Sequence, residues 1–146
     1  MHFKQLAVGV VPLDEEEHTW LVGQWRYTLD AWSWEIPEGG APFEEPALEA
    51  ARRELAEETG LLASRWTPLL ELHTSNSVTD ERAVAFLARG LSRGPTAPDD
   101  TERLALRRLP LDEALEMALD GRISDALSMT ALMKVRLLRE RGELPA

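Results

Sequence analysis

The distribution of apolar and polar positions along the chain predicts strands separated by short polar links. Residues 5–13 are almost continuously apolar and rich in β-branched side chains, which is typical of a buried strand. The polar run 14–17 predicts a turn after it, and Pro37 with Gly39 and Gly40 predicts the end of a later strand. Further strands are predicted over residues 18–26, 32–36, 66–74, 82–91 and 103–109. Links are predicted over residues 75–81 and 92–100.

Between residues 46 and 59 the apolar positions recur with the spacing of a helix. Pro46 suits the first turn of a helix, and Gly60 stands where a glycine commonly follows the last turn. The apolar positions that share one face of this segment are Leu48, Ala51 and Leu55. The spacing therefore predicts a helix over residues 46–59.

Two more helices are predicted in the last third of the chain. One covers residues 111–119, between Pro110 and Gly121, and Ser124 is the predicted cap of another that runs to about residue 141. Strands mixed with helices predict an α/β or α+β fold in which helical layers cover a sheet. The length of 146 residues suits a single domain over residues 1–146.

Composition and charge narrow the classes of function. The chain has 26 acidic and 16 basic residues and a formal net charge of −10, so its field repels nucleic-acid phosphates and anionic lipids. It has no cysteine, which excludes disulfides and thiolate chemistry. The longest apolar stretch, residues 6–13, is too short to span a bilayer and lacks a charged leader. These features predict a cytoplasmic protein that binds neither nucleic acid nor a membrane.

The acidic residues of the 46–59 segment oppose the local electrostatics. Glu57 and Glu58 lie in the last turn, where unpaired carbonyls already make the negative end of the helix. Glu54 and Glu58 are four residues apart, and two like charges at that spacing repel by about 0.2–0.5 kcal/mol. A solvated acidic face is one interpretation. The other is that the three glutamates share divalent cations, for which carboxylate oxygens favour Mg²⁺ or Mn²⁺ and disfavour zinc.

One stretch has the spacing of a known motif. Gly39 is followed after five residues by Glu45, and after seven more by the run Arg53-Glu54-Leu55-Ala56-Glu57-Glu58-Thr59-Gly60-Leu61. The pattern resembles the Nudix box of the Nudix hydrolases over residues 39–61. This resemblance implies an α/β fold, a Nudix-type α/β/α sandwich with a mixed β-sheet. It also implies Mg²⁺-dependent hydrolysis of a nucleoside diphosphate that is linked to another moiety.

Shorter stretches resemble the ADP-ribose pyrophosphatase branch of that family. They are residues 24–27, 32–40, 75–81 and 121–126. The resemblance implies hydrolysis of the pyrophosphate bond of ADP-ribose, or of a related nucleoside diphosphate sugar, to a nucleoside monophosphate and a sugar phosphate. Asn76 departs from this branch, where a proline is common, and the chain starts at the first predicted strand without the N-terminal subdomain of many relatives.

Two other functions stay open at this point. One is a Nudix pyrophosphohydrolase that acts on nucleoside triphosphates, damaged nucleotides or dinucleoside polyphosphates. The other is a non-catalytic module that binds a nucleotide sugar. Proteins of the second kind usually lose glutamates of the box, whereas this chain keeps all of them.

The resemblance also assigns roles to the acidic residues of the box. It implies that Glu54, Glu57 and Glu58 are metal ligands, with the backbone carbonyl of Glu38 as a further one. Arg53 would orient these glutamates by hydrogen bonds, although a plain surface ion pair is an alternative interpretation. The metals would clamp the pyrophosphate and lower the pKa of an attacking water.

A general base is expected in the link before the strand over residues 82–91. The resembling enzymes carry a catalytic glutamate in this segment, which points to Glu81. Asp80 and a glutamate of the box, such as Glu57, are the competing candidates for this catalytic role. A solvated charge at the start of a strand is the structural alternative for Glu81.

Substrate contacts are expected from the strands before the box. The resemblance implies that Arg26 contacts a phosphate or ribose, which suits a guanidinium because it recognises oxygens in pairs, and a surface charge at a strand end is the alternative. Trp32 is a candidate for stacking on a base, with a place in the core as the alternative. Glu35 lies in the same resembling segment and completes the predicted substrate-binding set. The family analogy further implies a homodimer that acts on a small nucleoside diphosphate derivative.

Overall fold

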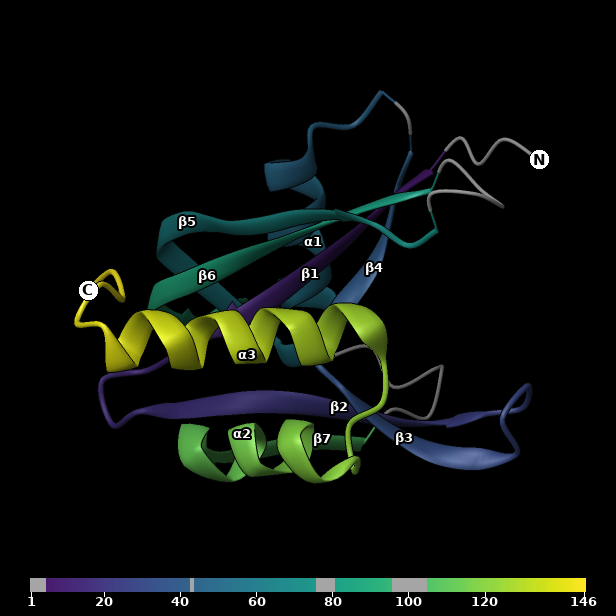
Figure 1. Cartoon of the computed structure of the whole chain (residues 1–146). Coiled ribbons are helices and arrows are strands. Elements are labelled where there is room, and N and C mark those ends of the chain that lie inside the picture. Colours follow the sequence, from purple (N-terminus) through teal and green to yellow (C-terminus); the bar gives the residue numbers. More distant parts are fainter. Residues whose placement is uncertain (1–4, 43, 76–80, 96–104) are drawn as a thin grey trace.

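A computed structural model describes residues 5–42, 44–75, 81–95 and 105–146, and within these ranges the chain forms strands and helices in mixed order (Figure 1). The elements in chain order are β1 (Gln5–Pro12), β2 (His18–Arg26), β3 (Ala31–Glu35), β4 (Glu38–Pro42), α1 (Ala47–Thr59), β5 (Leu61–His73), β6 (Arg82–Arg93), β7 (Ala105–Pro110), α2 (Leu111–Asp120) and α3 (Ala126–Glu140).

The strands form two sheets. The larger sheet has the order β4-β1-β6-β5, in which β1 and β6 are parallel and the other neighbours are antiparallel. The smaller sheet has the order β3-β2-β7 and is antiparallel throughout. The prediction of a mixed sheet is confirmed by the larger sheet. The smaller, antiparallel sheet was not predicted as a separate sheet.

Helices cover both faces of the larger sheet because its central strands are apolar on both sides. Val10 of β1 packs with Leu55 of α1, while the next residue, Val11, belongs to the core that includes Leu127 of α3. Successive side chains of a strand point to opposite faces, so α1 and α3 lie on opposite sides. Figure 1 shows α3 between the larger sheet and the layer formed by α2, β2 and β7. The predicted α/β/α sandwich is confirmed.

The predicted end of the strand at Pro37 is confirmed, since β3 ends at Glu35, but the strand that follows directly was not predicted. Residues Glu38–Pro42 form β4, which pairs antiparallel to β1 with Gly39 opposite Val8 and Gly40 opposite Ala7. The glycine pair indicated a turn because glycine has low strand propensity. Pairing with β1, whose residues Val8–Pro12 are buried, and close packing of Gly39 against Glu54 of α1 override that preference.

Most other predicted elements are confirmed, with shifted ends. β5 begins at Leu61, directly after the helix and five residues before the predicted start, and β6 extends to Arg93 into the predicted link 92–100. Residues 96–100 of that link, like residues 103–104 of the predicted last strand, lie outside the described residues. Antiparallel pairing of β5 with β6 from Leu61 to His73 explains the extra length.

The predicted helices are present, and their ends follow local chemistry. Gly60 has φ 75° and its N–H binds the Ala56 carbonyl, so it ends α1 in the left-handed conformation that glycine adopts without strain. Gly121 ends α2 in the same way, with φ 91°. The N-cap of α3 is Asp125 and not the predicted Ser124, since the Asp125 side chain accepts the Ser128 N–H.

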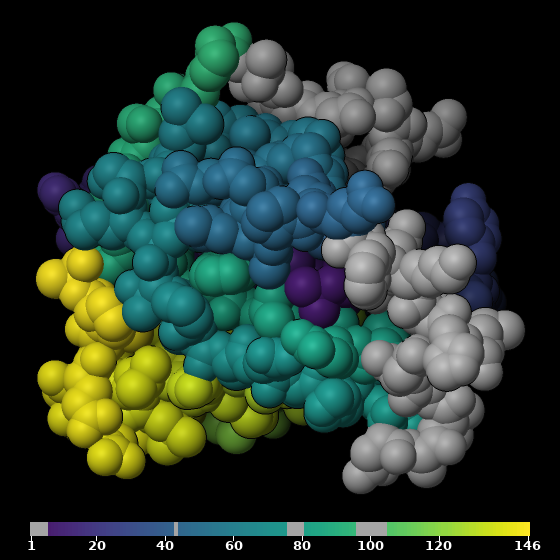
Figure 2. All heavy atoms as spheres, turned by 90° about the horizontal axis from the view of Figure 1, so that it is seen from above, coloured from purple at the N-terminus to yellow at the C-terminus, as the bar shows by residue number. Residues whose placement is uncertain are grey.

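The surface seen from above is formed mostly by the α1 and β5 part of the chain, in blue and teal, with the C-terminal part in yellow along one edge (Figure 2). None of the helices in the described ranges is both long enough and apolar enough to cross a membrane.

Candidate active site

The backbone of β4 lies directly against the acidic end of α1. The Glu38 N–H donates to Glu58 Oε2 at 3.2 Å. A Cβ placed on Gly39 would overlap the Glu54 carboxylate, at 2.6 Å from Oε2. Any other residue at position 39 would displace the Glu54 carboxylate, so the sheet edge brings peptide groups to the two carboxylates that the box places four residues apart.

Arg53 joins the start of α1 to the glutamates of its last turns. Its guanidinium donates to both oxygens of Glu45, at 2.9 and 3.3 Å, to the Gly40 carbonyl at 3.2 Å and to Glu54 Oε1 at 2.8 Å. Glu57 Oε2 lies 3.5 Å away. The hydrogen bonds with Glu45 are the largest reason why the pKa of Arg53 is raised, so the guanidinium stays charged.

This pairing agrees with the sequence spacing only in part. Arg53 lies four residues after Glu49 and four before Glu57, a spacing that predicts an ion pair with each, and the pair with Glu57 is present. In the structure Glu49 instead lies 4.0 Å from Arg52, and Arg53 turns toward β4 and Glu45. Arg53 is therefore placed to orient carboxylates at the sheet edge.

The three predicted carboxylate ligands do not converge equally. Glu54 and Glu58 contact β4, whereas the Glu57 side chain is 52% exposed at the outer side of α1. Within the part of the chain that the structure describes, one group of three potential ligand side chains has its atoms within 4.8 Å of one another, and it is Glu35, Glu38 and Asp125. Two of these three, Glu35 and Glu38, come from the β3–β4 corner, which is the segment of residues 35–38 where β3 ends and β4 begins. This corner lies outside the helix of the box.

The sequence predicts only part of this second acidic group. It indicates Glu38 as a carbonyl ligand and Glu35 as a substrate contact, but it assigns no role to Asp125 or to the nearby Ser128. The Ser128 hydroxyl lies 2.7 Å from Asp125 Oδ2 and 3.4 Å from Glu38 Oε2, and it accepts the Ile36 N–H at 3.0 Å. The available signal was the family-like stretch over residues 121–126, which contains Asp125.

Burial controls the protonation of Glu38. Its removal from water is the largest cause that raises the pKa, followed by its hydrogen bond and charge repulsion with Asp125 and then by Glu35, and together they raise the pKa of Glu38 to about 11. A carboxyl group with a pKa above neutrality is protonated at pH 7 and can donate a hydrogen bond. Burial and the neighbouring carboxylates thus favour the protonated form of this side chain.

Arg26 and Glu35 form a bidentate ion pair. Glu35 accepts from Arg26 Nε at 2.8 Å and from Nη2 at 2.5 Å, and it also accepts the Ser33 hydroxyl at 2.7 Å. The Glu35 side chain is only 3% exposed. The hydrogen bond with Glu35 is the largest cause that raises the pKa of Arg26. Glu35 thus holds the arginine and has its own oxygens occupied by protein donors.

Trp32 lies on the other face of the same two strands. Side chains alternate between the two faces along a strand, so Trp32 and Glu35, three positions apart in β3, point to opposite faces. Each shares its face with the residue it pairs with in β2, Trp25 for Trp32 and Val22 for Glu35. The Trp32 ring lies over Gly23, where a Cβ would approach it to 2.6 Å, and it meets Trp34 edge to face at 5.9 Å. The predicted substrate-binding set is therefore divided between two faces of β2 and β3.

Glu81 stands immediately before β6, at the end of the sheet where Ala83 pairs with Ala7 and Ala7 pairs with Gly40. Its backbone carbonyl accepts the Thr74 N–H at 3.3 Å, which ties it to the end of β5. The competing candidate Asp80 and the departing residue Asn76 lie outside the described residues.

The residues present fit a hard divalent cation. Where β4 meets α1, the carboxylates of Glu54 and Glu58 offer oxygen donors next to the backbone of Glu38, whose N–H donates to Glu58. Oxygen donors of this kind are what Mg²⁺ and Mn²⁺ prefer. The glycine at position 39 keeps the space beside the carboxylates free of a side chain.

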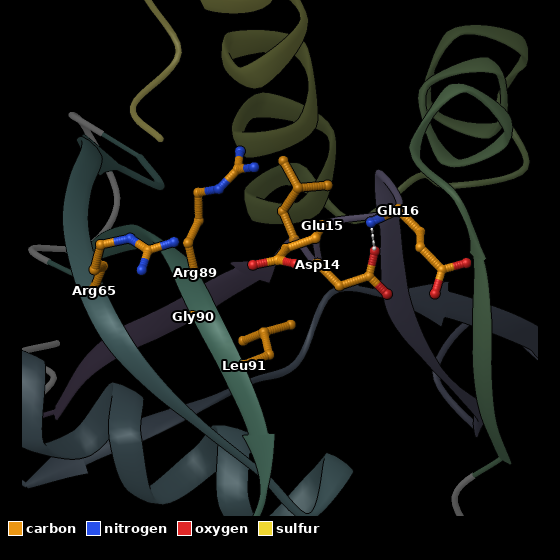
Figure 3. A pocket seen from close by; sticks show the side chains of 8 residues that line it. Asp14, Glu15, Glu16, Arg65, Arg89, Gly90 and Leu91 are labelled. Atoms are coloured by element: carbon orange, nitrogen blue, oxygen red, sulfur yellow. Dashed lines mark hydrogen bonds between the residues drawn. The ribbon is translucent and has the colours of Figure 1, made fainter.

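A separate pocket of about 290 Å³ lies near the turn after β1 (Figure 3). Arg65 and Arg89 of neighbouring strands line one side, and Asp14, Glu15 and Glu16 line the other. It contains none of the residues predicted from the sequence to bind metal or substrate, so the candidate site and this pocket are distinct places.

Comparison with known proteins links this geometry to a family. A family model described as the NUDIX domain matches residues 3–131. The chain is 34% identical over 133 residues to an ADP-ribose pyrophosphatase of Mycobacterium tuberculosis, covering 88% of this chain and 64% of that protein. It is also 34% identical to a methanol dehydrogenase activator of Bacillus methanolicus, over 90% of this chain and 72% of that protein.

A solved structure has the same fold. The crystal structure of an ADP compounds hydrolase superposes with a TM-score of 0.83 at 27% identity, covering 97% of this chain and 76% of that chain. The described elements therefore correspond to most of a known Nudix-type structure, while the chain spans only about two thirds of the length of the mycobacterial relative.

Proposed function

The chain belongs to the Nudix family, and from this premise we propose that it hydrolyses the pyrophosphate bond of ADP-ribose or of a related nucleoside diphosphate sugar. The products would be a nucleoside monophosphate and a sugar phosphate, since water is added across one P–O–P bond. The names of two proteins similar to this chain, an ADP-ribose pyrophosphatase and an ADP compounds hydrolase, support this substrate class.

The observation that carries the proposal is the contact between β4 and the end of α1. Gly39 lies so close to Glu54 that a side chain there would displace its carboxylate, and the Glu38 N–H donates to Glu58. Arg53 fixes Glu54 from the other side. These contacts arrange oxygen donors around one location despite the unfavourable helix end, which is costly without a bound cation to offset the repulsion.

We propose Mg²⁺, with Mn²⁺ as a substitute, as the cation that Glu54, Glu57 and Glu58 and the Glu38 carbonyl hold. When bound, it supplies charge neutralisation for the diphosphate and a lowered pKa for water. Glu57 reaches this role only from its exposed position on α1, so it is the ligand with the most freedom to move.

The chain's own residues supply the remaining steps. Glu81 would accept a proton from the attacking water at a carboxylate oxygen, and Arg26 would donate hydrogen bonds to the phosphate or ribose oxygens. Glu35 keeps the guanidinium of Arg26 in one orientation. Trp32 is 45% exposed and offers an aromatic surface for a base. This surface lies on the face of β2 and β3 opposite to Arg26 and Glu35.

A substrate panel tests the proposal. The purified protein with Mg²⁺ is incubated with ADP-ribose, other nucleoside diphosphate sugars, nucleoside triphosphates and dinucleoside polyphosphates, and products are separated by ion-exchange chromatography. We expect release of a nucleoside monophosphate from a diphosphate sugar, abolished by a chelator and restored by added Mg²⁺. Turnover of only triphosphates or polyphosphates would replace this proposal with the alternative hydrolase. Tight binding without hydrolysis at any metal concentration would favour a binding module.

Other expectations from the sequence remain part of this proposal. They are a single domain over residues 1–146, a homodimer, a cytoplasmic location and the absence of nucleic-acid binding. Light scattering after size-exclusion chromatography tests the dimer, and a mass near that of one chain would reject it.

A further inference from the structure

The first turn of α3 reaches the corner between β3 and β4 through a buried hydroxyl. Ser128 is fully buried, and its Oγ accepts the Ile36 N–H at 3.0 Å although the two residues are 92 positions apart. The same hydroxyl lies 2.7 Å from Asp125 Oδ2, the shorter of its two contacts with carboxylates. A hydroxyl has one proton to donate, so Ser128 donates to Asp125 and accepts from Ile36.

The hydrogen bond from the Ile36 N–H to Ser128 Oγ stabilises the β3–β4 corner and is not needed to cap α3. Capping of α3 needs only the bond from the Ser128 N–H to Asp125 Oδ2, at 3.0 Å. An alanine at position 128 would keep that cap. The Ile36 N–H, in contrast, lies just after the last paired residue of β3, so the hydroxyl provides the partner that a strand would otherwise supply.

The corner is held from three directions. Val10 of β1 donates to the Pro37 carbonyl at 2.9 Å, Ile36 donates to Ser128 of α3, and Glu38 donates to Glu58 of α1. Three consecutive residues are thus tied to three different elements. The last of these bonds leads directly to a carboxylate of the proposed cation site.

Apolar packing makes the contact with α3 tight. Ile36 is fully buried, and Leu127, the neighbour of Ser128, is almost fully buried. A Cβ on Gly9 would lie 2.8 Å from Ile36 Cδ1 and 3.0 Å from Leu127 Cδ2. Because interiors packed this closely transmit displacements, loss of the hydroxyl bond would shift the peptides of the corner.

We propose that Ser128, held by Asp125, is a positioning residue that fixes the peptides from Ile36 to Glu38. In this role it sets where the Glu38 carbonyl and the Glu58 carboxylate stand relative to a divalent cation. This role rests on the proposed function, which identifies the cation site. It goes beyond the proposed function because it assigns a role to α3, a helix that carries no residue of the box.

Substitution at position 128 tests the proposal by metal binding measured without substrate. Ser128→Ala removes the acceptor of a buried N–H, and Mn²⁺ affinity measured by calorimetry is expected to fall about tenfold, in the range known for groups that orient ligands. Turnover should fall by a similar factor, with KM for the substrate changed less than threefold. Ser128→Thr keeps a hydroxyl and is expected to restore most of the Mn²⁺ affinity.

A second variant and a matched control guard against a simple folding defect. Ser128→Cys fills the same space with a sulfur that accepts hydrogen bonds weakly, so it should show a loss of Mn²⁺ affinity even if Ser128→Ala does not fold. Thr130→Ala removes an exposed hydroxyl of the same helix, which donates to the Ala126 carbonyl at 2.7 Å. This control should bind Mn²⁺ like the unmodified protein.

The outcomes separate the two claims. Mn²⁺ affinity and turnover within twofold of the unmodified protein in folded Ser128→Ala or Ser128→Cys would overturn the positioning role. If the unmodified protein binds Mn²⁺ but cleaves no compound of the panel, the proposed function fails while the comparison of affinities still decides the role of Ser128. If the unmodified protein does not bind Mn²⁺, both proposals are rejected.

Discussion

Two acidic regions meet at β4 and are built in different ways. The glutamates of α1 lie close together in the sequence, border solvent and take their partners from Arg53 and the β4 backbone. The β3–β4 corner collects Glu35 and Glu38 with Asp125 from the far end of the chain, and it buries Glu35 fully and the other two in part. The first region keeps charge available for a ligand, whereas the second satisfies its polar groups internally.

This contrast leads to opposite expectations for mutations. Removing charge from α1 relieves repulsion between neighbours and should cost activity with little loss of stability. Removing a partner in the corner leaves a buried polar group without a hydrogen bond and should cost stability as well.

The largest effect is expected from Glu54→Gln and Glu58→Gln. Each should lower turnover about 10²–10³-fold, comparable to the loss of one preorganised electrostatic contact, with thermal unfolding nearly unchanged. Steady-state kinetics and calorimetry measure the two quantities. Glu49→Gln is the matched control, because Glu49 lies on the same helix, is exposed and has only a long contact of 4.0 Å with Arg52. Normal turnover in both variants would remove these residues from the active site.

A smaller loss is expected from Arg53→Gln. The variant loses the bonds to Glu45 and to the Gly40 carbonyl, so the orientation of Glu54 relaxes and turnover should fall about 10–100-fold. The Arg53 side chain is 37% exposed, and the loss of stability should stay below about 1 kcal/mol. Arg52→Gln is the control, and an equal loss of turnover in both would show that only the helix charge matters.

Stability is the main readout for Glu35→Gln. The amide cannot replace the charge that accepts two bonds from Arg26, and the buried pair should lose about 1–3 kcal/mol of unfolding free energy. Glu71→Gln removes a surface ion pair with Arg82, at 2.6 Å, and should change it by less than about 1 kcal/mol. Urea unfolding compares the two variants, and equal values would contradict the contrast between buried and exposed pairs.

The smallest effect is expected at a buried hydroxyl that is not satisfied. Thr19 Oγ1 is fully buried and has no hydrogen-bond partner among the described residues. Thr19→Val keeps the shape of the side chain and removes the unsatisfied group, so the unfolding free energy should rise by up to about 1 kcal/mol. A clear loss of stability in urea unfolding would show that the hydroxyl has a partner.

The elements with local signals were predictable from the sequence. The helix over residues 46–59 was recognised from its apolar spacing and Gly60, and the structure places α1 at Ala47–Thr59. β2 was predicted over the same residues that form it, 18–26. β4 was missed because Gly39 and Gly40 indicate a turn when only neighbouring residues are considered.

The candidate site was most predictable where its residues share one helix. Glu54, Glu57 and Glu58 were identified from their charge and spacing and, with Arg53, from the family motif. The pair of Arg53 with Glu57 followed from the spacing, but its pair with Glu45 did not. Ser128 was not identified, because the resembling stretch ends at residue 126 and residue spacing does not indicate a contact 92 residues away.

The sequence by itself determined the helices, most of the strands, the mixed α/β class and the family motif, since these depend on residue spacing along the chain. The tertiary structure decided which groups share a location. Pairing of β4 with β1 brings Gly39 to Glu54, and the register of β2 and β3 places Trp32 and Glu35 on opposite faces. Such contacts depend on strand pairing and burial between distant segments, which spacing along the chain does not specify.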